Sequence, residues 1–192
     1  MKTLNNLVTR VSQSGWLFII SAIFAFGSLF IVFMNINVAF EPIVGAQLFD
    51  FQNDLTVEEI FEQLERFNES AVALYYAFVF VDFFFPFFAG LVLAAAGAYA
   101  IRNLSTKWYD QINRRNLFAI FFIPTLFDWG ENIFAITVIN GYPNELTAAA
   151  TLLVLAKKGK LTSVMIMQLV VWSLLALALL KRMGQKVGLL ES

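Results

Sequence analysis

Three carboxylates lie inside apolar runs that are long enough to cross a membrane: Asp82, Asp128 and Glu131. The two runs that hold them, residues 71–100 and 117–139, contain no lysine, arginine or histidine. An unpaired carboxylate is costly in an apolar environment, so it takes up a proton, binds a cation or bonds to a specific partner. We therefore expect these side chains to mark a functional site.

Other polar residues fall at similar depth in the same runs. Glu131 and Asn132 follow Asp128 by three and four positions, which places all three on one face of a helix. Asp82 and Asp128 each lie near the twelfth residue of antiparallel spans, and at a rise of about 1.5 Å per residue both come near mid-depth. Gln168 lies at a comparable depth in the last span. We predict one polar cluster of these five residues, in which Asp82 and Asp128 titrate together.

Two prolines flank the predicted cluster. Pro86 follows Asp82 by four residues, and Pro124 precedes Asp128 by four. A proline inside a helix removes the hydrogen bond to the carbonyl four residues earlier, here those of Asp82 and Ile120. We expect both helices to kink near the same level and open a small polar space for a cation, a water cluster or a polar head group.

The composition is that of a membrane protein. Of the 192 residues, 59% are hydrophobic and 14% are charged, and the mean hydropathy is +0.72. A typical soluble domain has about 25% charged residues. Because the chain has no cysteine and no histidine, it cannot form thiolate or histidine metal sites or a Ser-His-Asp triad. We predict no catalytic residue and no protein-bound metal motif, and the cofactor is unknown.

Four stretches match the roughly 20 apolar residues that a transmembrane helix needs. They are residues 16–40, 71–100, 117–139 and 161–180. The prediction is an all-α, integral membrane, four-helix transmembrane bundle that forms a single domain over residues 1–192.

Two short amphipathic helices are expected on the outer side of this bundle. The first, at about 54–68 in the outer loop 41–70, has apolar residues at three- and four-residue spacing. The second runs from Pro143 or Asn144 to Ala156, and Gly159 is expected to separate it from the last span.

Loop charges predict the orientation. Residues 1–15, 101–116 and 181–192 are mainly basic, whereas residues 41–70 hold eight acids and one arginine. The positive-inside rule then places both termini in the cytoplasm. Three lysines disagree with this pattern and are expected to reach a membrane interface on the outer side; they are Lys157, Lys158 and Lys160.

Three functions are compatible with these features. The carboxylate cluster could bind a cation, a proton or an amphiphilic small ligand. Alternatively, the chain could be an accessory structural subunit of a larger membrane complex, with the acids as clasps between helices. Thirdly, a lipid-modifying enzyme such as an isomerase could use the acids for proton transfer, although no nucleophile–base pair favours catalysis. The expected partners are membrane lipid and either other subunits or a second copy of the chain, and not nucleic acid.

Overall fold

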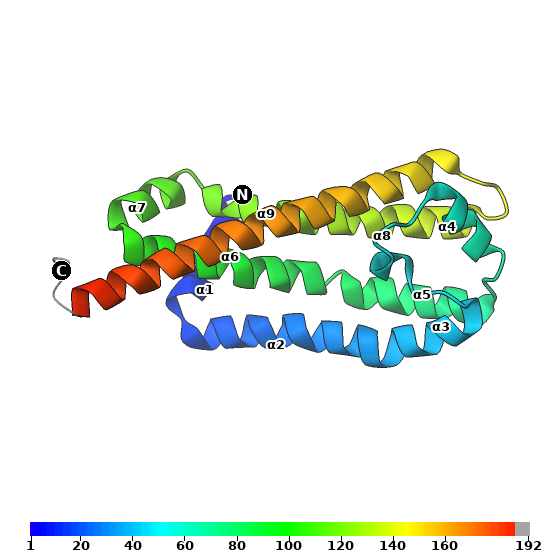
Figure 1. Cartoon of the computed structure of the whole chain (residues 1–192), viewed down its shortest axis with the longest axis horizontal. Coiled ribbons are helices and arrows are strands. Elements are labelled where there is room, and N and C mark those ends of the chain that lie inside the picture. Colours follow the sequence, from blue (N-terminus) through cyan, green and yellow to red (C-terminus); the bar gives the residue numbers. More distant parts are fainter. Residues whose placement is uncertain (187–192) are drawn as a thin grey trace. The chain divides into compact units, whose positions relative to one another are not determined.

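The computed structural model describes residues 1–186, which are helical throughout apart from short connections (Figure 1). The end of the predicted basic segment 181–192 lies outside the described residues. The chain forms two compact units. The first contains Met1–Ala22, Phe88–Ile123 and the chain from Ser163, and the second contains Ile23–Phe87 and Pro124–Thr162.

Four helical stretches within the described residues are long and apolar enough to cross a membrane, as predicted. They are Gly15–Val44, Glu69–Leu104, Leu117–Gly141 and Thr147–Lys186. Three of them are interrupted. The first consists of α2 (Gly15–Ile31), a π-helix η1 (Val32–Asn37) and α3 (Val38–Val44); the second of α5 (Glu69–Asp82) and α6 (Phe85–Leu104); and the third of a 3-10 helix η3 (Leu117–Phe122) and α8 (Ile123–Gly141).

The fourth stretch is one continuous helix, α9 (Thr147–Lys186). This corrects the prediction of a separate amphipathic helix that ends at Ala156 before a span at 161–180. The helix continues through Gly159. Glycine is needed there for packing rather than as a helix end, because a Cβ would lie 2.6 Å from the Phe127 ring. The local cost of a glycine within a helix, about 1 kcal/mol, is small beside such tertiary contacts.

The other predicted amphipathic helix is present as α4 (Val57–Leu64), which is shorter than the expected 54–68. It begins after Thr56 rather than at about residue 54. The Thr56 hydroxyl accepts from the Glu59 N–H, and the Glu59 carboxylate accepts from the Thr56 N–H. This reciprocal capping box defines the helix start.

The first unit holds α1 (Lys2–Gln13) against η3 and α7 (Thr106–Arg114). Asn5 is buried between them: its Nδ2 donates to Asn113 Oδ1 at 2.7 Å, and its Oδ1 accepts from the Phe118 N–H at 3.3 Å. The ring of Tyr109 packs on Phe118 with 5.6 Å between centroids. One buried amide side chain thus joins three segments of this unit.

The second unit has an aromatic core. Tyr75 on α5 packs against Phe40 from α3, against Phe49 from the loop that follows α3, and against Phe67 from the connection between α4 and α5. Phe49 and Tyr75 are almost fully buried. The predicted outer loop is therefore partly inside the unit, and its 3-10 turn η2 (Phe49–Phe51) lies between α5 and α8 in Figure 1.

Candidate functional site: a buried cluster of acids and lysines

Helix α8 supplies the first part of the site. Asp128, Glu131 and Asn132 are spaced three and four residues apart and share one buried face, with exposed fractions of 4%, 2% and 1%. The sequence spacing alone accounts for this arrangement.

Asp82, the last residue of α5, faces this part of α8. The Asn132 Nδ2 donates to Asp82 Oδ2 at 2.8 Å, and Asp82 and Asp128 have carboxylate oxygens within 4.8 Å of each other. In the part of the chain that the structure describes, no lysine or arginine forms an ion pair with Asp82. This carboxylate is 5% exposed, and among the described residues its direct hydrogen-bond partner is the Asn132 amide.

Each proline lies in the first turn of a helix after an interruption. α5 ends at Asp82, and α6 restarts at Phe85 with Pro86 as its second residue. Side chains of α8 donate hydrogen bonds to carbonyls near this break. Trp129 Nε1 donates to the Phe83 carbonyl at 3.0 Å, and Thr125 Oγ1 donates to the Pro86 carbonyl at 2.8 Å. These two carbonyls near the break thus have hydrogen-bond partners within the protein.

The predicted open carbonyl of Ile120 is not open. The chain before Pro124 forms the 3-10 helix η3, and the Ile123 N–H donates to the Ile120 carbonyl. A 3-10 turn bonds to the third residue back rather than the fourth, so it supplies the partner that proline lacks.

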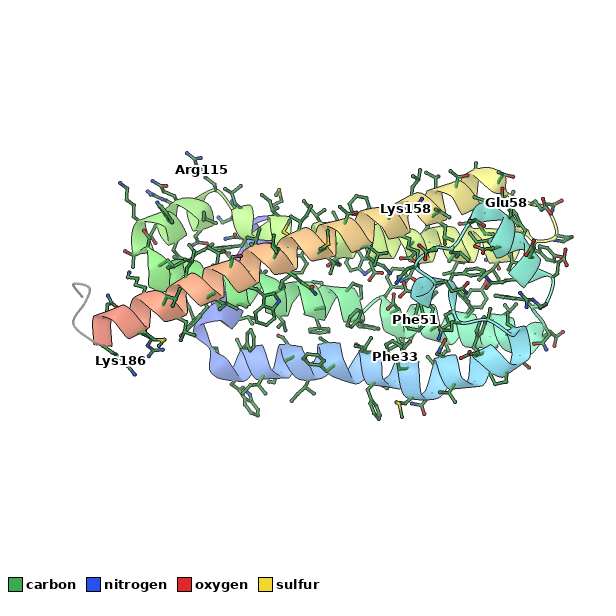
Figure 2. The ribbon with its side chains drawn as sticks, in the orientation of Figure 1. Phe33, Phe51, Glu58, Arg115, Lys158 and Lys186 are labelled. Carbon is green, nitrogen blue, oxygen red and sulfur yellow. The ribbon has the colours of Figure 1, made fainter. Side chains whose placement is uncertain are left out.

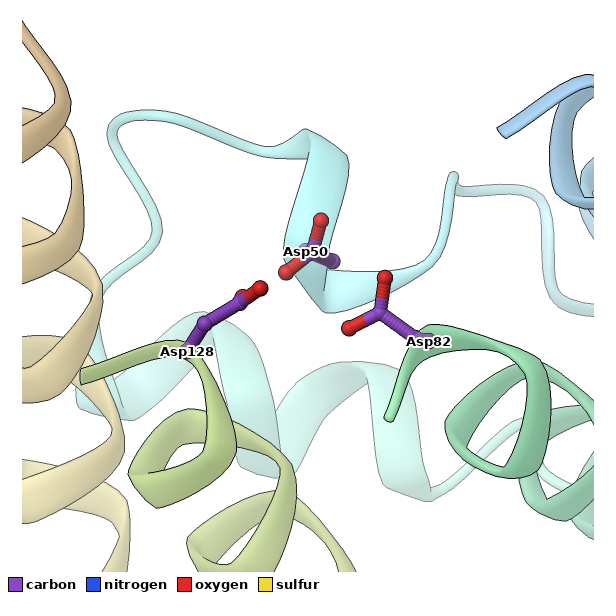
Figure 3. Close-up of side chains that lie close together, drawn as sticks. All are labelled: Asp50, Asp82 and Asp128. Carbon is purple, nitrogen blue, oxygen red and sulfur yellow. The ribbon is translucent and has the colours of Figure 1, made fainter. Parts of the chain in front are cut away.

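The loop after α3 contributes a fourth acid, which the sequence analysis did not place in the site. Gly45, with a φ of 73°, ends α3 in the left-handed conformation that glycine adopts readily, and the chain then turns back into the core of the second unit. Leu48 and Phe49 are buried, and Asp50 follows them. Figure 3 shows the carboxylates of Asp50, Asp82 and Asp128 facing one another, with one oxygen of each within 4.8 Å of the others.

Two lysines of α9 complete the cluster, which corrects the expectation that they reach a membrane interface. Lys157 is 2% exposed, and its Nζ donates to the carbonyls of Phe49 and Asp50 at 2.6 and 2.7 Å and to Glu131 Oε1 at 3.2 Å. The expectation failed because lysines near the end of an apolar run resemble interfacial residues, and only the fold shows acids opposite them.

Lys160 bridges three carboxylates. Its Nζ forms ion pairs with Asp128 Oδ1 at 2.9 Å, with Glu131 Oε2 at 2.6 Å and with Asp50 Oδ1. Lys158, between the two lysines of the cluster, is exposed and labelled in Figure 2. A spacing of three residues places Lys157 and Lys160 on one helix face, and this spacing is the signal that could have identified them.

Gln168 belongs to the first unit and is exposed on α9. Its membership of the cluster stays a prediction. The other four predicted residues lie together in the second unit.

The charges of the cluster do not balance. Asp50, Asp82, Asp128 and Glu131 carry four negative charges when ionised, against two positive charges on the lysines. Two negative charges are left over in a buried site, which is costly unless protons or cations neutralise them. Carboxylate oxygens are hard ligands that suit alkali, Mg²⁺ and Ca²⁺ ions.

No protein-family model, no curated protein and no solved structure matches this chain. The proposals that follow therefore depend on the geometry of the second unit and on the charge pattern of the sequence.

Proposed function

We propose that this chain is an integral membrane protein whose buried cluster of acids and lysines reversibly binds protons or a small cation. The observation that carries the proposal is the excess of two negative charges among side chains that are at most 14% exposed. Ionisable side chains within membrane spans commonly mark ion pathways or proton relays, because a purely structural role rarely repays their desolvation.

The depth of the cluster supports this proposal. Asp82 lies thirteen residues from the start of α5, Asp128 thirteen residues from the end of α8, and Lys160 thirteen residues from the start of α9. At about 1.5 Å per residue, each is about 20 Å from its helix end. In a hydrocarbon core about 30 Å thick that begins at these helix ends, such positions lie inside the core, about 10 Å from the opposite interface.

The orientation is part of the same proposal. Basic residues gather in the segments 1–15 and 101–116, and acidic residues gather in 41–70. The positive-inside rule then puts both termini in the cytoplasm and the loop that carries Asp50 on the outer side.

The alternative of an accessory subunit with clasped helices also has an observation in its favour. The cluster connects α5, α8, α9 and the loop after α3 through hydrogen bonds and ion pairs. A clasp of this kind needs no exchange of ions, so it predicts that stability is insensitive to cations and to the charge of Asp82.

Asp82→Asn separates the two functions. The amide keeps the size of the side chain and can still accept from Asn132, but it removes the one acid of the cluster that has no lysine partner. Thermal melts of the purified protein in detergent would be recorded from pH 5 to 8 and with Na⁺, K⁺, Mg²⁺ or Ca²⁺ at constant ionic strength. A ligand present at 100 times its Kd stabilises the folded state by about 2.7 kcal/mol.

We expect the wild type to respond to protons or to one of these cations, and Asp82→Asn to stay folded with that response reduced or lost. The matched control is Asp54→Asn, which removes an exposed acid from the same loop region. Identical responses in the wild type and Asp82→Asn would contradict the proposal and favour the clasp.

A further inference from the structure

The segment that carries Asp50 is inserted into the second unit and is here called the plug (residues 45–56). Its apolar side chains Leu48, Phe49 and Leu55 are buried. Phe51 stacks on Phe33 of η1 with 4.5 Å between ring centroids, and both are labelled in Figure 2. The plug is thus packed like core structure although it belongs to a loop between two spans.

The plug's polar contacts to the preceding η1 and the following α4 lie on residues outside its turn η2. The Leu48 N–H donates to Asn37 Oδ1 at 3.3 Å, and the amide groups of Gln52 and Gln63 bond reciprocally at 2.8 and 2.9 Å. Gln63 lies in α4, which directly follows the plug along the chain. These contacts lie on Leu48 and Gln52, which flank the plug's deepest turn, η2, and not on η2 itself.

The two lysines of α9 hold that deepest turn. Lys157 binds its backbone through the carbonyls of Phe49 and Asp50, so this contact does not depend on the charge of Asp50. Lys160 binds the Asp50 carboxylate and, at the same time, Asp128 and Glu131 of α8. The plug's attachment through Lys160 therefore uses the same carboxylates that would hold protons or a cation.

Competition for Lys160 follows from this geometry. A proton on Asp50 abolishes its ion pair with the ammonium, and a cation bound by Asp50 and Asp128 repels the ammonium from the same oxygens. The charged and titratable groups around Lys160 are Asp50 from the plug, Asp82 and Tyr75 from α5, Asp128 and Glu131 from α8, and Lys157 from α9. Each of these elements contributes to the balance that holds or releases the ammonium.

We propose that Lys160 is a latch that couples the occupancy of the carboxylate cluster to the position of the plug. With the carboxylates ionised and without a cation, Lys160 holds Asp50 and the plug is closed. When protons or a cation occupy the cluster, Lys160 loses Asp50 and the plug opens. The trigger rests on the proposed function, whereas the mechanical link between Lys160 and the plug does not.

The chain has no cysteine, so single cysteines report the plug position cleanly. Leu48→Cys places a thiol at a fully buried position of the plug, and Gln47→Cys places one at the exposed neighbour. Val138→Cys, at a buried position of α8, reports unfolding of the core. The measurement is the rate of modification by a water-soluble maleimide in detergent, normalised at each pH to the rate at Gln47→Cys.

The latch is broken in two ways, by Lys160→Gln and by the milder Asp50→Asn, which leaves Lys160 paired with Asp128 and Glu131. In both backgrounds we expect modification at Leu48→Cys to rise about tenfold or more, as for a local opening made easier by about 1.4 kcal/mol, while Val138→Cys stays protected. Lys158→Gln, which removes an exposed charge next to the cluster, should change neither rate. No rise in either background, or an equal rise at Leu48→Cys and Val138→Cys in both, would overturn the latch.

A second experiment uses the same cysteine variants with Lys160 and Asp50 unchanged and applies the proposed trigger. The trigger is a shift from pH 8 to pH 5 or addition of the cation that stabilises the wild type in the melts. The latch together with the proposed function predicts faster modification at Leu48→Cys alone. If the substitutions open the plug but neither protons nor cations do, the latch stands and the proposed function fails. If a cation binds and the plug stays closed in every background, the latch fails and the proposed function stands.

Discussion

At the scale of single residues, Lys157 has a hydrogen-bond partner for each of its three donors. An ammonium has three N–H donors, and Lys157 directs its donors at two backbone carbonyls of the plug and at Glu131. The site is 2% exposed, so water cannot replace these partners. Removal of the ammonium takes this hydrogen-bond donor away from the carbonyls of Phe49 and Asp50 and from Glu131 Oε1.

We predict that Lys157→Met lowers the free energy of unfolding by about 3 kcal/mol or more, the cost typical of breaking a buried pair at one partner. Methionine keeps most of the apolar stem, so the loss reports the ammonium. Lys158→Met, at an exposed position, should stay within about 0.5 kcal/mol of the wild type. Unfolding in detergent by added denaturant measures both, and equal stabilities would refute this view of Lys157.

A double substitution tests whether Glu131 is the residue left uncompensated. If so, adding Glu131→Gln to Lys157→Met should recover part of the lost stability, because the buried charge is then removed. Strict additivity of the two losses would show that the plug carbonyls, and not Glu131, account for the cost.

At the scale of elements, the close approach of α9 and α8 positions the lysines on the acids. Gly159 lies between Lys157 and Lys160 along α9 and meets the ring of Phe127, the residue before Asp128. A side chain at Gly159 would push the two helices apart where their charged groups meet.

We predict that Gly159→Leu lowers the free energy of unfolding by about 1–3 kcal/mol, the usual range for overpacking. Gly27→Leu is the matched control, since Gly27 is also inside a helix but a Cβ there meets nothing within 4 Å. That control should be neutral or stabilising, because leucine is the better helix former. The same loss of stability at both glycines would mean that helix packing at Gly159 is not tight.

The elements also show how far sequence patterns reach. Helical spacing and span depth were sufficient to group Asp82 with Asp128, Glu131 and Asn132, because each relation depends on one helix or on a pair of antiparallel helices. Asp50 could not be identified from the sequence, because a loop has no periodicity that distinguishes a buried residue from an exposed one. The folding of the plug into the aromatic core is a long-range effect, set by the burial of Leu48 and Phe49.

At the scale of the whole molecule, the buried cluster and the loops have different charge distributions. The net charge is −1, which hides a buried excess of acid in the cluster and an unequal distribution along the loops. Buried acids contribute little to orientation during insertion, whereas lysines and arginines in short loops determine it. Lys157 and Lys160 lie within α9 and face acids of the second unit, so they are not loop residues of the kind that the rule counts.

The orientation is tested by single cysteines in a chain that has none. Asn53→Cys lies in the loop 41–70 and Thr106→Cys in the segment 101–116; both positions are exposed, and neither substitution changes a charge. In intact cells we expect a membrane-impermeant maleimide to modify Asn53→Cys and to reach Thr106→Cys only after the membrane is permeabilised. This follows because the acidic loop is translocated and the basic segment is retained in the cytoplasm. Modification of Thr106→Cys in intact cells, with Asn53→Cys protected until permeabilisation, would reverse the orientation and place the plug on the cytoplasmic side.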